Sequence, residues 1–198
     1  MDEQKLIQQV SEGDQDAFRE IVRANRDMVI NVCYNLLNDR EQAEEVAQDV
    51  FLSIFKRAGK FKGKSRLSTW IYRVAVNSAI SARRRKRLLK TRVDIRQEAA
   101  ADVASLKAPL ADSPDFRLEA AEIRAAIHKA LDSLPEKQRA FIILHKMEGL
   151  SAREIAQIFR ISVSSSEARI HRAKRNLRKE LTRLLSLSLG KNTFITEP

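Results

Sequence analysis

Apolar residues recur at helical spacing along most of the 198-residue chain. The clearest series is Ala43, Val46, Ala47, Val50, Phe51, Ile54 and Phe55. Because its steps alternate between three and one, these side chains share one side of a helix. The other side carries Glu41, Glu44, Glu45, Gln48 and Asp49. The pattern predicts an amphipathic helix with one buried face and one acidic face.

Similar spacing and capping residues predict further helices in the first half of the chain. One short helix is expected over residues 2–12, and the next begins after Asp14 or Asp16. Asp39 with Gln42 is a capping pair for the acidic helix. Ser65 or Ser68 is expected to open a helix that ends in the basic run 83–87.

The second half separates from the first because the pattern fails from about residue 88 to 116, where Pro109 and Pro114 break any helix. A new unit starts near Asp115. The segments 133–136 and 151–154 both have the form of capping boxes, and Ser162 can cap a last helix. The expected fold is all-α, with two small helical domains at 1–90 and 115–185, a flexible linker at 91–114 and a tail at 186–198.

The boundaries in the second unit have helix-turn-helix spacing: a helix of about eight residues, a tight turn, and a longer basic helix. The last helix has a polar outer face suited to the major groove of DNA. That face offers Ser165, Ala168, Arg169, His171 and Arg172, followed by Lys174, Arg175 and Arg178 for phosphates. An ordinary helical hairpin is the alternative.

The net charge is +11, and the charged residues are distributed unevenly along the chain. Residues 61–93 contain 11 basic and no acidic side chains, and residues 137–198 contain 13 basic and 5 acidic ones. The segments 1–60 and 94–136 are each net acidic. Two separate basic surfaces indicate two contacts with one polyanion.

Composition argues against several other classes of protein. A single cysteine, Cys33, allows no disulfide within the chain, and the opening residues do not resemble a signal peptide. No apolar run is long enough for a membrane span. The three histidines lack metal-ligand spacing, and no glycine-rich phosphate loop is present, so we expect neither metal, cofactor nor enzymatic activity. A DNA recombinase would need a phosphotransfer centre. Neither tyrosine, Tyr34 or Tyr72, has a nearby group of His, Arg and Lys residues that would form one.

Several motifs together resemble a known family. In the second unit these are 134–139 (LPEKQR), 148–151 (EGLS), 154–156 (EIA), 161–163 (ISV) and 169–173 (RIHRA). In the first they are 13–18 (GDQDAF), 43–51 (AEEVAQDVF), 61–65 (FKGKS) and 69–77 (TWIYRVAVN). In their order along the chain, these motifs are similar to those of the extracytoplasmic-function (ECF) group of the sigma-70 family. The members of this family are the bacterial RNA polymerase sigma factors.

The resemblance implies a cytoplasmic protein that binds core RNA polymerase, reads the promoter −10 and −35 elements and helps melt the DNA. Glu45, Gln48 and Asp49 would contact the polymerase, and an anti-sigma factor would be a further partner. The implied DNA-binding residues are Phe61, Lys62, Lys64, Trp70, Arg73, Asn77, Arg83, Arg84, Arg85, Ser165, Arg169, His171, Arg172 and Arg175. The linker, with its acids Asp94, Glu98, Asp102, Asp112 and Asp115, would run through the polymerase.

Three residues depart from the family pattern: Ser81 where Asp is usual, Ser166 where Val is usual, and Glu167 where Lys is common. We expect these departures to bear on which promoter is read and on how tightly the last helix packs. Alternatives also remain for single residues, since Trp70 is either a core anchor or a stacking surface, and the loop at 61–64 is either a base pocket or an ordinary loop. A two-domain repressor or activator that is no polymerase subunit is the alternative function.

Overall fold

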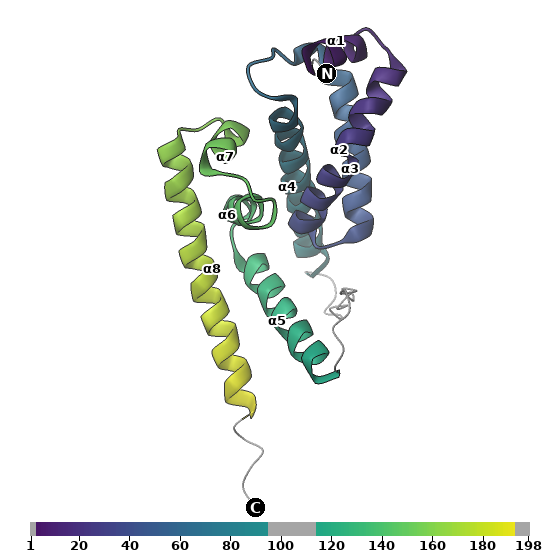
Figure 1. Cartoon of the computed structure of the whole chain (residues 1–198). Coiled ribbons are helices and arrows are strands. Elements are labelled where there is room, and N and C mark those ends of the chain that lie inside the picture. The colour runs from purple at the N-terminus through teal and green to yellow at the C-terminus, as the bar shows by residue number, and fades with distance from the viewer. Residues whose placement is uncertain (1–2, 95–113, 193–198) are drawn as a thin grey trace, which may run out of the picture.

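The computed structural model describes residues 3–94 and 114–192. Figure 1 shows two groups of helices side by side. The N-terminal bundle consists of α1 (Glu3–Ser11), α2 (Gln15–Leu37), α3 (Arg40–Arg57) and α4 (Leu67–Asp94), with a 3-10 turn at Ala58–Lys60. The C-terminal bundle consists of α5 (Pro114–Ser133), α6 (Glu136–Ile142), a π-helical turn at Ile143–Met147, α7 (Ala152–Phe159) and α8 (Val163–Asn192). The predicted all-α fold is confirmed, with no strand in the described ranges.

Two predicted caps in the N-terminal bundle are confirmed. The Asp14 carboxylate accepts hydrogen bonds from the backbone N–H groups of Asp16 and Ala17, at 2.8 and 3.0 Å. The Asp39 carboxylate accepts one from the Gln42 N–H at 3.0 Å. Each satisfies N–H groups that a helix start leaves without a partner, so α2 and α3 begin where their sequences predict.

The start of α4 differs from the prediction. Neither Ser65 nor Ser68 caps it; instead, the Glu3 carboxylate of α1 accepts a hydrogen bond from the Leu67 N–H at 2.7 Å. The helix also continues past Arg87 to Asp94, into the predicted linker. The linker acids Glu98, Asp102 and Asp112 and the last six residues, 193–198, lie outside the described residues.

The predicted apolar stripe of α3 forms the centre of the N-terminal core. Every member except Phe55 is buried, and Phe55 is 37% exposed with its ring edge against Phe18. Cys33 of α2 is buried in the same core, and burial raises the pKa of its thiol to about 12. A thiol that stays protonated is a poor nucleophile, so Cys33 is a packing residue.

In the C-terminal bundle, one of the two predicted capping boxes is correct. The Ser151 hydroxyl accepts from the Glu154 N–H while the Glu154 carboxylate accepts from the Ser151 N–H, which opens α7. The box at 133–136 is wrong. Ser133 still belongs to α5, and its hydroxyl donates to the Ala130 carbonyl, so Pro135 precedes α6 without a side-chain cap.

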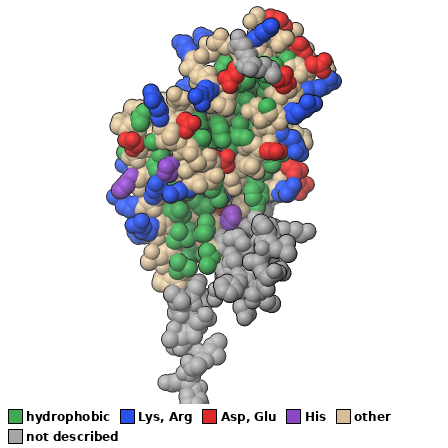
Figure 2. Space-filling model, in the orientation of Figure 1, with side chains coloured by type: hydrophobic (Ala, Val, Ile, Leu, Met, Phe, Trp, Pro, Cys, Tyr) green, Lys and Arg blue, Asp and Glu red, His purple; other side chains and the backbone are tan. Residues whose placement is uncertain are grey.

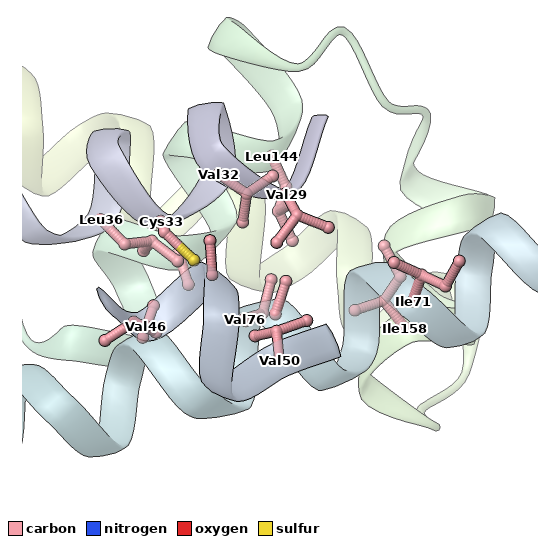
Figure 3. Close-up of a cluster of buried hydrophobic side chains, with 14 of the residues drawn as sticks. Val29, Val32, Cys33, Leu36, Val46, Val50, Ile71, Val76, Leu144 and Ile158 are labelled. Atoms are coloured by element: carbon pink, nitrogen blue, oxygen red, sulfur yellow. The ribbon is translucent and has the colours of Figure 1, made fainter. Parts of the chain in front are cut away.

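The two bundles share one apolar core. Figure 3 shows Leu144 and Ile158 of the C-terminal bundle among Val29, Val32 and Ile71 of the N-terminal bundle. All five are buried. Helices α6 and α7 lie against α4 (Figure 1), and the π-helical turn at Ile143–Met147 lies against α2.

Candidate nucleic-acid interface

The polar side of α3 is open to solvent. Glu45, Gln48 and Asp49 are all exposed, and they lie on a different side of α3 from the buried stripe. Their side chains are therefore free of the core, so changing them opens no cavity. Asp49 also lines a cleft between the two bundles.

The loop between the 3-10 turn and α4 has a shape that depends on glycine. Gly63 has φ +65°, and a Cβ added there would collide with the Gln4 side chain. Phe61 packs against Trp70, with ring centroids 5.4 Å apart. Lys62 and Lys64 are exposed beside this pair. The loop thus presents two cations next to an aromatic pair, an arrangement compatible with a splayed base and its phosphates.

Trp70, Arg73 and Asn77 lie three and four residues apart, so they occupy one face of α4. All three line the cleft, whose volume is about 790 Å³. Ile158, Phe159 and Arg160 form its opposite wall. Trp70 and Arg73 are partly buried, and Asn77 is exposed. In this arrangement the predicted DNA-facing side of α4 looks toward α7.

Arg73 is held by the end of α7. Its Nε donates to the Ile158 carbonyl at 2.9 Å, and Nη2 donates to the Gln157 carbonyl at 2.6 Å. Carbonyl groups at a helix C-terminus lack partners within the helix and attract a cation. Burial and then the nearby charge of Arg160 lower the pKa of Arg73.

The arginine run on α4 divides into two sets. Arg83 donates to the Asp132 carboxylate at 2.9 Å, which places it against the C-terminal bundle. Lys86 pairs with Asp39 at 2.8 Å, and hydrogen bonding to Lys86 lowers the pKa of the Asp39 carboxyl. Arg84 and Arg85 are exposed. Phosphate contact is therefore best suited to Arg84 and Arg85.

The predicted helix-turn-helix is formed by α7, a tight turn and α8. Arg160 takes a left-handed conformation with φ 55° and ends α7, and the Ser162 hydroxyl accepts from the Ser165 N–H at 3.2 Å to begin α8. Arg169, His171, Arg172 and Arg175 are exposed, and Ser165 is half-buried. Figure 2 shows Lys, Arg and His side chains along the edge of the molecule that α8 forms.

Two details of α8 refine the sequence prediction. Arg169 lies over the Phe141 ring, 5.9 Å from its centroid, so part of this side chain contacts its own bundle. Ser166 is fully buried, and its hydroxyl has no hydrogen-bond partner within the described residues. Glu167, beside it, is exposed.

Sequence reasoning missed the polar contacts that join the bundles. Glu148 accepts hydrogen bonds from Asn35 at 3.1 Å and from Tyr72 at 3.5 Å. Burial raises the pKa of Glu148, and burial with the Glu148 charge raises the pKa of Tyr72 to about 12. Arg139 is fully buried, pairs with Asp132 and donates to the Asn35 carbonyl. No periodicity signals such contacts, because their partners lie far apart in sequence.

Residues 21–88 match the family model for sigma-70 region 2, and residues 124–177 match that for sigma-70 region 4. The chain is 34% identical over 179 residues to the ECF RNA polymerase sigma factor SigW of Bacillus subtilis, covering 89% of this chain and 95% of SigW. The chain belongs to the ECF group of the sigma-70 family. The alternative of a repressor that is no polymerase subunit is not favoured.

Two solved structures share the fold of this sigma factor. CnrH in complex with the cytosolic domain of CnrY aligns with TM-score 0.61 at 22% identity, over 93% of this chain and 97% of that one. The sigma factor RpoE of Bartonella quintana, in complex with the anti-sigma factor NepR, aligns with TM-score 0.59 at 21% identity, over 83% and 96%.

The described residues contain neither a candidate membrane span nor a candidate metal cluster. None of their helices has the length and apolar character to cross a membrane. No group of three or more His, Cys, Asp or Glu side chains among them is placed to hold a metal ion.

Proposed function

We propose that this sigma factor binds core RNA polymerase through α3, directs it to promoters through α8, and helps open them through α4 and the preceding loop. The observation that carries the proposal is that three surfaces of different character lie on different elements of the chain. An exposed acidic face, a basic loop and helix, and a basic helix-turn-helix lie on different elements of one chain. The proposed units remain 1–90, a linker at 91–114, 115–185 and a tail at 186–198, although α4 and α8 each extend past the boundary assigned to them.

Glu45, Gln48 and Asp49 form the proposed polymerase contact. Because they are exposed and make no part of the core, their acidic and amide groups are available to a basic or hydrogen-bonding partner surface. Charge complementarity at such a surface sets specificity and the rate of association.

The proposed −10 contact combines Phe61, Lys62, Lys64, Trp70, Arg73 and Asn77 with the arginine run. Aromatic rings stack on unpaired bases, and the cations neutralise phosphates of the melted strand. In the proposed −35 contact, Arg172 and His171 face the bases and Arg175 the backbone, since Arg can bond bidentately to guanine.

The remaining partners and properties follow from this role. CnrH and RpoE were each solved with a second protein, named as an anti-sigma factor for RpoE, which supports an anti-sigma partner here. A subunit that works with core polymerase would act in the cytoplasm. Its own contribution would be binding and strand separation rather than catalysis.

The test is transcription by purified core polymerase on fragmented genomic DNA of the source organism, with and without the full chain. The expected result is a small set of new transcript starts that share upstream sequence at two spaced elements. Identical transcript starts with and without the chain would reject the proposal.

A further inference from the structure

The cleft between the two bundles is strongly basic. Its volume, about 790 Å³, is within the range of pockets that hold small ligands. Asp49 is the one acidic side chain among the described residues that line it, whereas the cationic ones are Arg57, Lys60, Arg73, Arg85 and Arg160. These cations come from both bundles, because α7 lies against α4 (Figure 1). A hollow with this excess of positive charge attracts an anion.

Four of the cations lack an acidic partner among the described residues. There, no ion pair or hydrogen bond joins a carboxylate to the side chains of Arg57, Lys60, Arg85 or Arg160. The pKa of Arg73 is lowered by burial and then by the charge of Arg160, so these two cations repel each other. An anion bound between the walls of the cleft would relieve that repulsion, which favours its binding.

Ser81 adds to the imbalance of charge. It lines the cleft, at a position where Asp is usual in the family. An Asp there would stand one turn before Arg85 on α4, which is the spacing at which opposite charges pair on a helix. Ser81 instead supplies a hydroxyl, and Ser53 and Ser78 supply two more. Because hydroxyls donate hydrogen bonds to phosphate oxygens, this chain departs from the family pattern in a direction that favours a phosphate ligand.

One part of the cleft suits a flat aromatic group. Trp70 lines it together with the apolar side chains of Val74 and Phe159, and all three are half-buried. The Trp70 ring is supported by Phe61, with ring centroids 5.4 Å apart. A nucleobase stacks on such a ring without a requirement for one particular base, while nearby cations hold its phosphates.

We propose that the cleft is a binding site for a nucleoside polyphosphate, with the base against Trp70 and the phosphates between Lys60 and Arg160. The ligand bridges the two bundles, because Lys60 ends the 3-10 turn of the first and Arg160 follows α7 in the second. The site shares Trp70 and Arg73 with the proposed −10 contact. It does not rest on that contact, and its test uses neither DNA nor polymerase.

Three variants of the full chain change the cleft. Lys60→Gln and Arg160→Asn each remove one cation. Asn is chosen at 160 because it tolerates the left-handed backbone there, where φ is 55°. Ser81→Asp adds a carboxylate, which repels phosphate and is placed to pair with Arg85.

Two further variants are matched controls. Lys56→Gln and Arg153→Gln each remove an exposed cation that lies outside the lining of the cleft. They change the net charge as much as Lys60→Gln and Arg160→Asn do. All five variants are first checked for native helix content by circular dichroism.

Binding of ATP, GTP and inorganic tripolyphosphate is then measured by isothermal titration calorimetry. Quenching of Trp70, the only tryptophan in the chain, is the second readout. Wild type should bind both nucleotides about tenfold more tightly than tripolyphosphate, because stacking adds to the phosphate contacts. Lys60→Gln and Arg160→Asn should each weaken nucleotide binding about tenfold through loss of a charge-assisted hydrogen bond, and Ser81→Asp at least as much. Both control variants should match wild type.

The remaining outcomes contradict the proposal. Absence of nucleotide binding by wild type, or unchanged affinity in folded Lys60→Gln, Arg160→Asn and Ser81→Asp proteins, would overturn the site. Equal weakening by Lys56→Gln and Arg153→Gln would show that nucleotides bind the basic surface in general. Tripolyphosphate that binds as tightly as ATP and GTP would overturn the assignment of a nucleoside ligand.

Discussion

Arg73 of α4 donates from Nε to the backbone carbonyl of Ile158 at the end of α7, across 2.9 Å. The two residues are 85 positions apart in sequence, and each belongs to an element with a separate proposed role on DNA. This contact links α4, the helix proposed to open the promoter, to the helix-turn-helix. Because the contact joins the two bundles, variants of either bundle are best measured in the full chain.

The first prediction concerns the loop before α4. Phe61→Ala with Lys64→Ala removes one aromatic ring and one exposed cation, and neither side chain is fully buried. We expect the variant to bind core polymerase normally but to show weaker permanganate reactivity of promoter thymines, because the melted strand loses stacking and a phosphate contact. Full reactivity in a folded variant would show that the loop is no base pocket.

The second prediction concerns Glu167, which is exposed at the start of α8. A carboxylate there repels a nearby phosphate. Glu167→Lys should raise affinity for all duplex DNA and steepen the salt dependence by about one to two phosphates' worth, since each neutralised phosphate contributes about 0.9 to the logarithmic slope. Glu180→Lys is the matched control. An unchanged salt slope for Glu167→Lys would place position 167 away from the backbone.

The third prediction concerns the buried hydroxyl of Ser166, which lacks a hydrogen-bond partner among the described residues. A buried polar group without a partner costs about 1–3 kcal/mol. Ser166→Ala should therefore raise the free energy of unfolding by about 1 kcal/mol in urea titration. Ser164→Ala, at an exposed position of the same helix, should change it little. Destabilisation by Ser166→Ala would indicate that the hydroxyl has a partner.

The fourth prediction concerns pH. Burial, then the charge of Arg139, lowers the pKa of His128 below its usual 6.5, against an opposing effect of Asp132. As pH falls below 6.5, the unfolded chain gains a proton at His128 that the folded chain does not, so this residue lowers stability there.

His128→Gln should therefore lose less thermal stability than wild type between pH 7.5 and pH 5. The control is His171→Gln, which removes an exposed imidazole from α8. Thermal melting curves of the three proteins between pH 7.5 and pH 5 test this prediction. Equal losses for wild type and His128→Gln would mean that His128 does not contribute to the pH dependence.

Local patterns predicted much of the fold because their causes are local. Asp14, Asp39 and the pair Ser151–Glu154 cap helices through groups two or three residues away. The stripe of α3 is buried because its spacing matches one helical face. The prediction at Ser133 failed because α5 continues through that residue, so its hydroxyl bonds to α5 rather than to α6.

Long-range contacts could not be predicted in this way. Glu3 caps α4 across 64 positions, and Glu148 meets Asn35 across 113. A single sequence carries no spacing signal for such pairs. The sequence could still nominate candidate surfaces, because exposed charge on amphipathic helices is a local property. That α4 and α7 face each other across the cleft depends on tertiary packing, which local patterns do not show.

The central claim is that this sigma factor binds core RNA polymerase through the acidic face of α3. The most direct test compares retention of purified core polymerase by immobilised wild type, Asp49→Arg and Asp27→Arg chains. Asp27 is exposed on α2, outside the proposed contact, so its replacement makes the same charge change elsewhere. We predict that wild type and Asp27→Arg retain the polymerase, whereas Asp49→Arg binds it about a hundredfold more weakly. Failure of wild type to retain polymerase, or equal retention by a folded Asp49→Arg chain, would contradict the account.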